Sequence, residues 1–310
     1  MGYIYIYDKV KLNLKEKFAM KKRKFFLIIL PVLILALTFT GCAKKQSAEF
    51  DPEKEITVVA RDSASGTRGA FHEIMKIKVK ENDTEVDNLV VGALEFDGTD
   101  KVVTAVEGDK YGIGYISLGS VSGRIKAVAV NGAEPSVDNV KNGSYVVSRP
   151  FLLVTKGDES NLVKDFLGFA ASTQGQEISV GMHYIGSADE SAEYTASGMS
   201  GTIKVAGSTS VTPLMEKLQE AYKALNPDVK FEMQSNGSSQ GIKAAMDASY
   251  DIGMSSRELK EDEASQLNRY ILAIDGIAVI LNNKNPISDI SSENITNIYT
   301  GEITKWSEVK

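Results

Sequence analysis

Three short segments rich in hydroxyl and glycine residues constrain what this chain can fold into. Residues 63–68, 207–210 and 237–241 each lie where a strand-like pattern gives way to a helix-like pattern. The first N–H groups of a helix have no partner within the helix, and the helix dipole makes that end positive. Glycine lets a ligand approach the backbone closely, and Ser or Thr hydroxyls add donors. Helix capping explains one such segment without a ligand, but three in one chain favour a site for an oxyanion.

The order of the predicted elements indicates an α/β protein. Strands and helices alternate, beginning with a strand at 56–60 and a helix at 67–75. Further strands are predicted at 112–116, 125–130, 146–155 (broken by Pro150), 203–206, 229–233 and 251–254, and further helices at 101–107, 162–171, 214–225 and 242–246. Residues 186–201, rich in Ser, Gly, Ala and acids, are predicted to be a linker. With 310 residues, the chain is long enough for two lobes.

The N-terminal region has the pattern of an export signal. Four basic residues at 21–24 precede an apolar run at 25–39. This pattern predicts a secretory signal over residues 20–41. A permanent transmembrane helix is the lower-ranked alternative, because the run contains Pro31 and is shorter than about 18 apolar residues. Residues 1–19 are interpreted as an upstream extension, with translation starting at Met20.

Cys42 directly follows the small residues that end this signal, and it is the only cysteine in the chain. A lone cysteine excludes an internal disulfide. Cys42 resembles the lipid-modified cysteine of bacterial lipoproteins, although Phe39 stands where that motif usually has leucine. Residues 42–54 would then be a polar tether between a lipid anchor and the folded part of the chain.

Charge and histidine content exclude several kinds of site. Beyond residue 41 the chain has 39 acidic and 27 basic side chains, a formal net charge of −12. Nucleic acid is excluded as a partner, because binding it needs a basic surface. An anionic ligand must instead be held by short, oriented hydrogen bonds. The only histidines, His72 and His183, lack metal-ligand spacing. We therefore predict no metal site and interpret both as surface or helix-face residues.

Five motifs resemble those of the phosphate-binding proteins of phosphate ABC transporters. They lie at residues 61–68, 207–213, 237–242, 251–257 and 300–306, and the resemblance covers nearly all of residues 55–310. It implies a two-lobed periplasmic-binding-protein-like fold of type II, with two crossovers between the lobes. It also implies an extracytoplasmic protein, lipid-anchored to the cell membrane, that captures inorganic phosphate and delivers it to the permease. Neither catalysis nor a cofactor follows from the resemblance.

The order of these motifs differs from that of the family. In the family, the segment that resembles residues 207–213 opens the mature protein, whereas here the family's second half comes first. The order resembles a circular permutation in which residues 186–201 join the old ends. A rearranged gene and an assembly error are the alternatives. Permutation is tolerated where the old ends lie close together and the new break falls in an exposed loop. In the family, the segment that resembles Trp306 runs directly into the one that resembles Ile56, so Lys310 is expected near residues 50–55.

Mapped onto this order, the resemblance implies a boundary for each lobe. The predicted ranges are 55–121 and 283–310 for lobe B, 122–282 for lobe A, and 121–130 and 277–285 for the two crossings. Hinge closure would enclose the ligand between the lobes.

The resemblance implies phosphate contacts from both lobes. The implied residues are Thr209, Ser210, Ser238 and Ser256 in lobe A, and Arg61, Ser65, Gly66 and Thr67 in lobe B. Arg61 would supply the charge-assisted contact, because its guanidinium fork suits a tetrahedral oxyanion. Closing the cleft would therefore complete the set of donors.

Selectivity for phosphate over sulfate needs an acid in addition to the residues above. Some family members have an Asp at the Ser256 position, where it accepts the phosphate proton and repels sulfate, and serine cannot do so. We predict Asp275 as the replacement, because it interrupts the apolar run at 271–281. The alternative is a structural Asp that pins a turn.

The sequence leaves other functions open as alternatives to phosphate binding. Residues 237–241 fit the G-x-S-x-G pattern of a hydrolase nucleophile elbow, with Ser239 as the nucleophile. That fold needs its histidine after the serine, and both histidines here precede it, so we predict that the chain is not an enzyme. Two binding alternatives remain, namely another oxyanion such as sulfate or molybdate, and a surface lipoprotein used for adhesion or signalling.

Overall fold

The structure is a computed structural model that describes residues 49–309, except residues 83 and 188–190. Residues 50–310 form one unit, separate from residues 1–49. The predicted upstream extension, the signal sequence and Cys42 lie outside the described residues, as do Lys310 and part of the predicted linker. Over the described part of the chain, none of the helices has the length and apolar character needed to span a bilayer.

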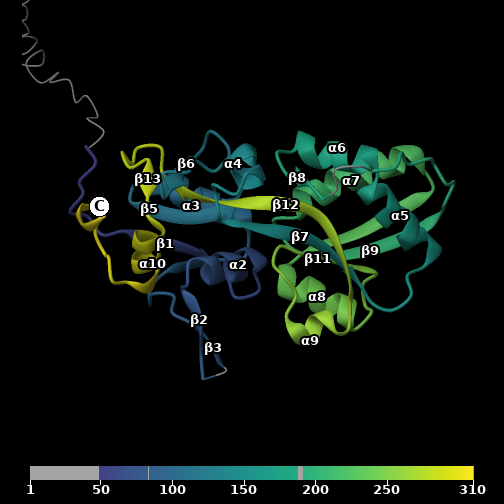
Figure 1. Cartoon of the computed structure of the whole chain (residues 1–310), viewed down its shortest axis with the longest axis horizontal. Helices are drawn as coiled ribbons and strands as arrows, with labels where there is room; N and C mark the ends of the chain where they lie inside the picture. The colour runs from purple at the N-terminus through teal and green to yellow at the C-terminus, as the bar shows by residue number, and fades with distance from the viewer. Residues whose placement is uncertain (1–48, 83, 188–190, 310) are drawn as a thin grey trace, which may run out of the picture. The chain divides into compact units, whose positions relative to one another are not determined.

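Two large hydrophobic cores divide residues 50–310 into two lobes, which strands β7 (Ser148–Thr155) and β12 (Asn268–Leu281) join (Figure 1). One core buries Phe71, Tyr115 and Tyr299, and we call its surroundings lobe B. The other buries Phe166 and Tyr222, and we call its surroundings lobe A.

Lobe B contains residues 50–147 and 277–309. Besides the end of β12, its elements are β1 (Thr57–Arg61), α2 (Gly66–Ile74), β2 (Lys78–Glu81), β3 (Thr84–Asp87), β4 (Leu94–Phe96), α3 (Thr99–Gly108), β5 (Gly112–Ser117), η1 (Leu118–Ser120), β6 (Lys126–Val130), α4 (Val137–Lys141), β13 (Asp289–Ile290), α10 (Ser292–Thr300) and η2 (Trp306–Glu308). Strands β2 and β3 form a hairpin that projects from this lobe (Figure 1).

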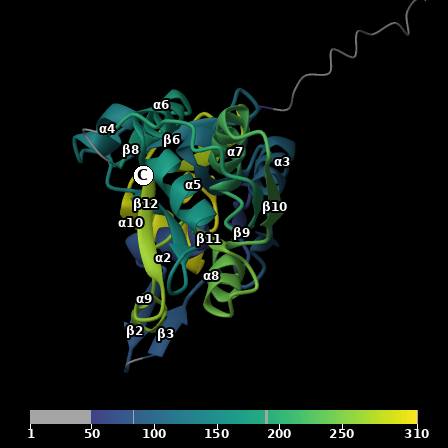
Figure 2. The same cartoon turned by 90° about the vertical axis from the view of Figure 1, so that its right-hand side faces the viewer.

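Lobe A contains residues 148–276. Besides β7 and the start of β12, its elements are α5 (Asn161–Ala171), α6 (Thr173–Gly181), β8 (Ile185–Gly186), β9 (Gly201–Gly207), α7 (Thr212–Leu225), β10 (Val229–Ser235), α8 (Ser238–Met246), β11 (Ile252–Ser255) and α9 (Glu261–Ala264). Helices α5, α6 and α7 pack on one face of the lobe A sheet, and α8 packs on the other (Figure 2).

One continuous sheet order, β10-β9-β11-β7-β12-β5-β1-β4, runs through both lobes. Strands β9, β10 and β11 are mutually parallel in lobe A, and β1, β4 and β5 are parallel in lobe B. Ligand sites of open α/β sheets lie beyond the carboxyl ends of parallel strands. The loops that follow β1, β9, β10 and β11 carry the predicted site residues.

The first crossing between the lobes lies further along the chain than the predicted range of 121–130. Strand β6 pairs with the lobe B end of β12 and with β13, so residues 122–147 belong to lobe B. The chain crosses at 147–149 and returns at 275–277, where Asp275 pairs with Arg149 and Gly276 with Ser148. The apolar run at 271–281 is a single strand that passes straight through Asp275.

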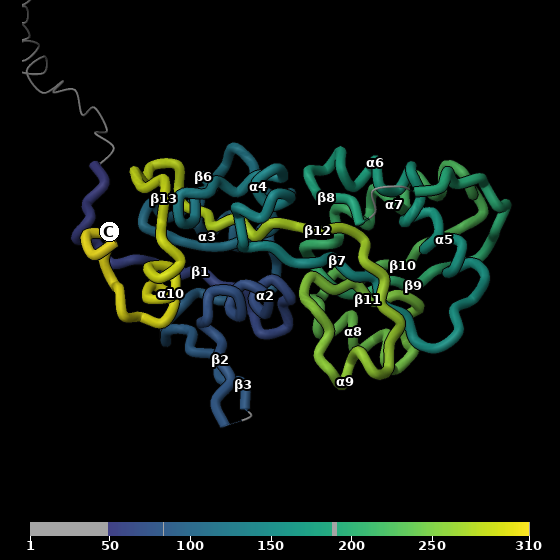
Figure 3. Tube along the Cα trace, viewed as in Figure 1, coloured from purple at the N-terminus to yellow at the C-terminus, as the bar shows by residue number. Residues whose placement is uncertain are grey.

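The C-terminal segment lies against the start of lobe B (Figure 3). Ser307 N–H donates to Pro52 O at 2.8 Å, and Glu55 forms a β-bridge with Lys305. The Phe50 ring packs on Trp306 with centroids 6.2 Å apart. The expected proximity of the two ends is therefore found up to residue 309, and residues 50–54 are packed on lobe B rather than extended as a tether.

The predicted linker is mostly exposed in its described part, but Tyr194 anchors it to lobe A. The Tyr194 hydroxyl donates to Asp165 at 2.6 Å, and its ring contacts Phe169. The sequence also missed α6, which begins where Ser172 caps the helix through Gly175 N–H. Strand β7 is not broken by Pro150, which lies opposite Ile274 of β12. On the other side of β7, β11 pairs only at Leu152–Val154, so no strand of the described part faces Pro150 there.

Candidate functional site

Three helices begin at the boundary between the lobes, and the first two meet there directly. At the start of α2, a Cβ atom on Gly66 would lie 2.2 Å from Ser238 Oγ at the start of α8. Ser239 N–H donates to Ala64 O at 3.1 Å across the same boundary. This approach requires glycine at position 66, because any side chain there would collide with α8.

The third helix start, that of α7, reaches the same place from lobe A. Thr67 Oγ1 and Ser210 Oγ lie 2.8 Å apart, and one hydroxyl donates to the other. Both side chains are almost completely buried. The predicted lobe B and lobe A segments are therefore in hydrogen-bonded contact.

A chain of hydroxyls lines lobe A beneath this contact. Ser208 Oγ donates to Ser256 Oγ at 2.8 Å, and Ser256 Oγ lies 3.3 Å from Ser238 Oγ. Ser256 N–H donates to Ser238 Oγ at 3.0 Å. All three side chains are buried. These residues come from three separate loops, so only the folded sheet brings them together.

Arg61 is a cation at this boundary, and only 2% of its surface is exposed. Its Nη2 donates to Thr209 Oγ1 at 2.8 Å, which joins lobe B to lobe A. The same Nη2 donates to Asp97 O at 3.0 Å, and Nε donates to Phe96 O at 3.1 Å. Two carbonyls therefore fix the plane of the guanidinium so that it faces lobe A.

Burial lowers the pKa of the Arg61 guanidinium, although Asp62 and Asp97 act in the opposite direction. The ordinary pKa of an arginine lies far above neutral pH, so the group stays cationic. Asp62 is the acid next to Arg61, and burial raises the pKa of its carboxyl. Its Oδ1 is buried and has no hydrogen-bond partner among the described residues.

Ser65 has the capping role that sequence analysis gave as the alternative to ligand binding. Its Oγ accepts from Arg68 N–H at 3.3 Å, so it is the N-cap of α2. The side chain is nonetheless buried at the lobe boundary, next to Gly66 and Thr67. Capping and ligand contact are compatible, because a capping hydroxyl retains its own O–H as a donor.

Asp275 is occupied by other partners. Its Oδ2 accepts from Arg149 Nη2 at 3.0 Å, and its Oδ1 accepts from Ser117 Oγ at 2.9 Å. Burial raises the pKa of Asp275 to about 6, although Arg149 and Ser117 oppose the shift. Within the described residues it makes no hydrogen bond to the hydroxyl chain of lobe A. This arrangement matches the structural alternative more closely than the role of phosphate acceptor.

Three residues of this boundary were missing from the predicted set. Ser208 was quoted within a motif but given no role, and Thr99 Oγ1 lies 3.4 Å from Arg61 Nη1. Thr99 opens α3 directly after Gly98, so the glycine–hydroxyl signal at a helix start would have found it. Tyr115, which accepts Arg61 N–H at 3.1 Å, carries no local signal.

The two histidines occupy different environments. His183 is exposed, as predicted, whereas His72 is fully buried on the inner face of α2. His72 therefore belongs to the core, not to the surface. Over the residues that the structure describes, no group of three or more His, Cys, Asp or Glu side chains could hold a metal ion.

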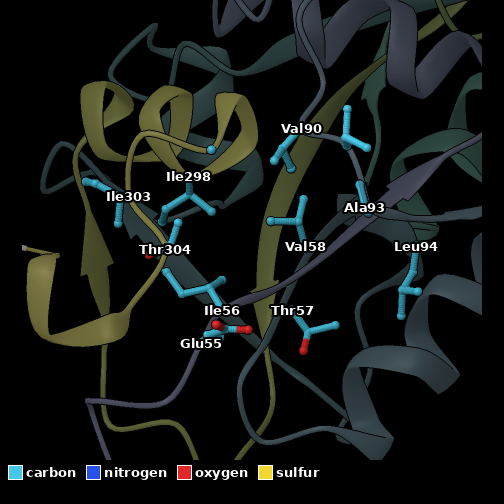
Figure 4. Close-up of a pocket in the computed structure, with 13 residues that line it drawn as sticks. Glu55, Ile56, Thr57, Val58, Val90, Ala93, Leu94, Ile298, Ile303 and Thr304 are labelled. Atoms are coloured by element: carbon cyan, nitrogen blue, oxygen red, sulfur yellow. The ribbon is translucent and has the colours of Figure 1, made fainter.

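Two pockets lie near these elements, and they differ in character. One opens at the lobe boundary and is lined by residues that include Ser63, Ser65, Ser239, Arg257 and Lys260. The other lies within lobe B and is lined largely by apolar side chains of β1, α10 and the loop before β4 (Figure 4). None of the predicted site residues lines the lobe B pocket, so it is not the candidate site.

Chemically, this boundary can hold a small anion. It offers one fixed guanidinium, several buried hydroxyls and the starts of three helices, all of which favour negative charge. Hydroxyls accept as well as donate, so they can also take a proton from a partly protonated oxyanion.

Comparisons with known proteins give consistent results. The profile of the PBP superfamily domain matches residues 24–174 and 192–310. Phosphate-binding protein PstS 2 of Streptococcus pneumoniae serotype 4 is 43% identical over 270 residues, which cover 87% of this chain and 91% of that protein. The crystal structure of a phosphate-binding protein of a phosphate ABC transporter from Streptococcus pneumoniae superposes with a TM-score of 0.69 at 43% identity, covering 83% of this chain and all of that one.

A more distant relative matches only part of the chain. Phosphate-binding protein PstS of Borreliella burgdorferi is 32% identical over 108 residues, which cover 34% of this chain and 39% of that protein. The long pneumococcal match is a single alignment, so those two chains have their segments in the same order.

Proposed function

The chain belongs to the phosphate-binding protein family within the PBP superfamily, and we propose that it captures inorganic phosphate between its lobes and delivers it to an ABC transporter permease. The observation that carries this proposal is the contact of Arg61 with Thr209 amid buried hydroxyls from both lobes. A guanidinium held by backbone carbonyls is an oriented donor for a tetrahedral anion.

We propose that phosphate is held by residues on the two faces of this boundary. They are Arg61, Ser65, Gly66 and Thr67 in lobe B, and Thr209, Ser210, Ser238 and Ser256 in lobe A. Ser208 and Thr99 would support this set by fixing Ser256 and Arg61. The arrangement suits an acidic protein, because neutral donors and the buried Arg61 do not depend on a positive surface.

A thermal-shift screen across oxyanions tests this function. Phosphate at 100 times its dissociation constant is expected to stabilise the protein by about 2.7 kcal/mol, because it binds only the folded state. Sulfate, molybdate and chloride at matched ionic strength are the comparisons. A larger shift with sulfate or molybdate than with phosphate would assign the site to that oxyanion, and no shift with any of them would contradict anion binding.

Replacing Asp275 by asparagine tests both interpretations of this residue. We expect the free energy of unfolding to fall by about 3 kcal/mol, because Arg149 would keep a buried charge without its counter-charge. Asp228→Asn, at an exposed position, is the matched control for urea unfolding.

The same variant tests the proposed role of Asp275 in selectivity. If Asp275 accepts the phosphate proton, competition titration will show relaxed phosphate-over-sulfate selectivity in Asp275→Asn. Asp62→Asn is the comparison, because Asp62 Oδ1 is buried beside Arg61 without a partner. Unchanged selectivity together with lost stability would leave Asp275 a purely structural residue.

The hydrolase alternative has little support. Both ring nitrogens of His72 are engaged, with Asp87 at 2.9 Å and Tyr115 at 3.2 Å, and His183 is exposed. Among the described residues, neither histidine hydrogen-bonds to Ser239. A nucleophilic serine needs a base within hydrogen-bonding reach, so ester turnover is not expected. Among the described residues at this boundary, we find none that specifically favours adhesion or signalling over anion binding.

We also propose that the protein acts outside the cytoplasm, anchored by lipid on Cys42. The basic residues and apolar run over 20–41 support export, and the position of Cys42 supports lipid attachment. The relatives that bind phosphate support a permease partner in the membrane.

The permuted order remains our proposal for how this chain relates to other family members. A collinear alignment can follow only one of two exchanged halves, and the match to the Borreliella burgdorferi protein covers about a third of each chain. An assembly error confined to this sequence would not be matched over 270 residues by the pneumococcal protein. The adjacency of the segments near Pro52 and Ser307 supports this proposal, because the family order would join these two segments directly.

A further inference from the structure

A closed ring of hydrogen bonds starts at the backbone N–H of Arg61 and returns to its backbone C=O. Arg61 N–H donates to Tyr115 Oη at 3.1 Å, and Tyr115 Oη lies 3.2 Å from His72 Nε2. His72 Nδ1 lies 2.9 Å from Asp87 Oδ1, and Arg68 Nε donates to Asp87 Oδ2 at 3.0 Å. Arg68 Nη1 then donates to Arg61 O at 2.9 Å, which closes the ring.

The end of a strand pair explains why Arg61 needs this ring. Strand β1 pairs with β5 only at Thr57 and Val58, so the two strands diverge before Arg61. The N–H and C=O of Arg61 therefore lack partners in the β5 ladder. A buried backbone group without a partner is costly. The side chains of Tyr115 and Arg68 take the place of the missing strand.

The pairing of donors and acceptors in the ring fixes which atom of each side chain carries a proton. A carboxylate only accepts, so His72 Nδ1 carries the proton that it shares with Asp87. Neutral His72 then has an unprotonated Nε2, which accepts the O–H of Tyr115. Tyr115 Oη in turn accepts Arg61 N–H. Every donor thus meets an acceptor only while His72 is neutral.

We propose that Tyr115 and His72 are positioning residues that hold the backbone of Arg61, so that its guanidinium faces the phosphate. The inference rests on the proposed function of Arg61. Among the described residues, the only side-chain hydrogen bond from this pair to the predicted phosphate shell is that of Tyr115 Oη with Arg61 N–H, and His72 acts through Tyr115.

Protonation of His72 would reverse one bond of the ring. An imidazolium donates from both nitrogens, so Nε2–H and Arg61 N–H would both point at Tyr115 Oη, and the Tyr115 O–H would lose its acceptor. The charged or titratable groups around His72 are Arg68 on α2, Asp87 on β3, Glu95 on β4, Tyr115 on β5 and Tyr299 on α10. Burial lowers the pKa of His72 despite the opposing effect of Asp87, which keeps the ring intact at neutral pH.

The first test is the affinity for phosphate of two variants, measured by isothermal titration calorimetry at pH 8. Tyr115→Phe is expected to bind phosphate roughly tenfold more weakly, because Arg61 N–H loses its buried acceptor. His72→Gln is expected to bind nearly as well as wild type, because an amide can donate to Asp87 and accept from Tyr115. The control is Tyr270→Phe, which removes a partly exposed hydroxyl bonded to Glu159. Equal affinity of Tyr115→Phe and wild type would overturn the proposal.

The second test is the pH profile. A histidine whose pKa is lowered on folding stabilises the native state above its unfolded pKa of about 6.5, and that contribution is lost as pH falls below it. Protonation of His72 in the folded protein would disrupt the bond of Tyr115 to Arg61, so affinity of the wild type relative to His72→Gln is expected to fall as pH is lowered below about 6.5 through the folded pKa of His72. The ratio cancels the ionisation of phosphate itself. Parallel profiles would overturn the proposed role of His72.

A third measurement does not depend on ligand binding. The imidazole nitrogen chemical shifts of His72, assigned with His183→Gln, are expected to show a proton on Nδ1 at pH 8. A proton on Nε2 would contradict the ring even in a protein that binds no phosphate. Failure of the wild type to bind phosphate, with Nδ1 protonated, would instead contradict the proposed function and leave the ring in place.

Discussion

Replacing Arg61 by lysine is expected to weaken phosphate binding by at least about 100-fold. The guanidinium uses Nη2 for both Thr209 and Asp97 O and Nε for Phe96 O, and a lysine amino group cannot reproduce that fork. Each charge-assisted hydrogen bond contributes about 1.5 to 3 kcal/mol, so the loss of two corresponds to roughly 100-fold or more. Isothermal titration calorimetry with phosphate measures the change.

Arg124→Lys is the matched control. Arg124 is a partly exposed arginine that pairs with Asp100 and Glu107 on α3, away from the lobe boundary. Its replacement is expected to leave phosphate affinity unchanged. Thermal unfolding of Arg61→Lys separates lost binding from lost folding. A well-folded Arg61→Lys variant with wild-type affinity would show that the cation at this boundary does not hold the ligand.

Arg61 and the hydroxyl segments could be predicted because their signals are local. Glycine and hydroxyl residues at the start of a helix are a short-range pattern, and it identified the starts of α2, α7 and α8 before any fold was known. The resemblance then placed these segments in one family. The α/β two-lobed fold and the family are confirmed by the pneumococcal relatives and by the superfamily match.

The boundary between the lobes could not be predicted in the same way. Residues 122–147 follow a strand of lobe B, but their assignment depends on the pairing of β6 with β12, about 150 residues later in the chain. Pairing at that separation leaves no mark on local periodicity. The partner of Asp275 could not be predicted for the same reason. Arg149 lies opposite Asp275 only because of the register in which β7 and β12 pair.

The hydrogen-bond ring around Arg61 could not be predicted either, because it also depends on contacts between residues far apart in the chain. Tyr115, His72 and Asp87 lie on three elements, and each alone has an ordinary interpretation as a core tyrosine, a helix-face histidine or a surface acid. Their common role follows from the divergence of β1 and β5 after Val58. Sequence patterns therefore reveal the residues that would contact a ligand. They reveal less easily the residues that hold those contacts in place.

Closure of the lobes depends on the absence of a side chain at position 66, which makes Gly66→Ala a second large perturbation. The added Cβ would lie 2.2 Å from Ser238 Oγ, 2.8 Å from Ser238 Cβ and 2.8 Å from Ser256 Oγ. Ser238 Cβ is fixed to the first turn of α8 and cannot rotate away. Overpacking of this kind costs about 1 to 3 kcal/mol, so phosphate affinity is expected to fall roughly 5- to 150-fold.

The collision arises only when the lobes are together. If the lobes open when phosphate leaves, as the proposed hinge closure requires, unfolding of the ligand-free variant is expected to match wild type. Gly168→Ala is the control, because Gly168 lies on the exposed face of α5 with no atom within 4 Å of an added Cβ. It is expected to keep full affinity and to gain up to about 1 kcal/mol of stability from helix propensity. Small-angle scattering with saturating phosphate adds a direct readout of closure. A Gly66→Ala protein that contracts and binds like wild type would mean that α2 and α8 do not approach this closely in the bound state.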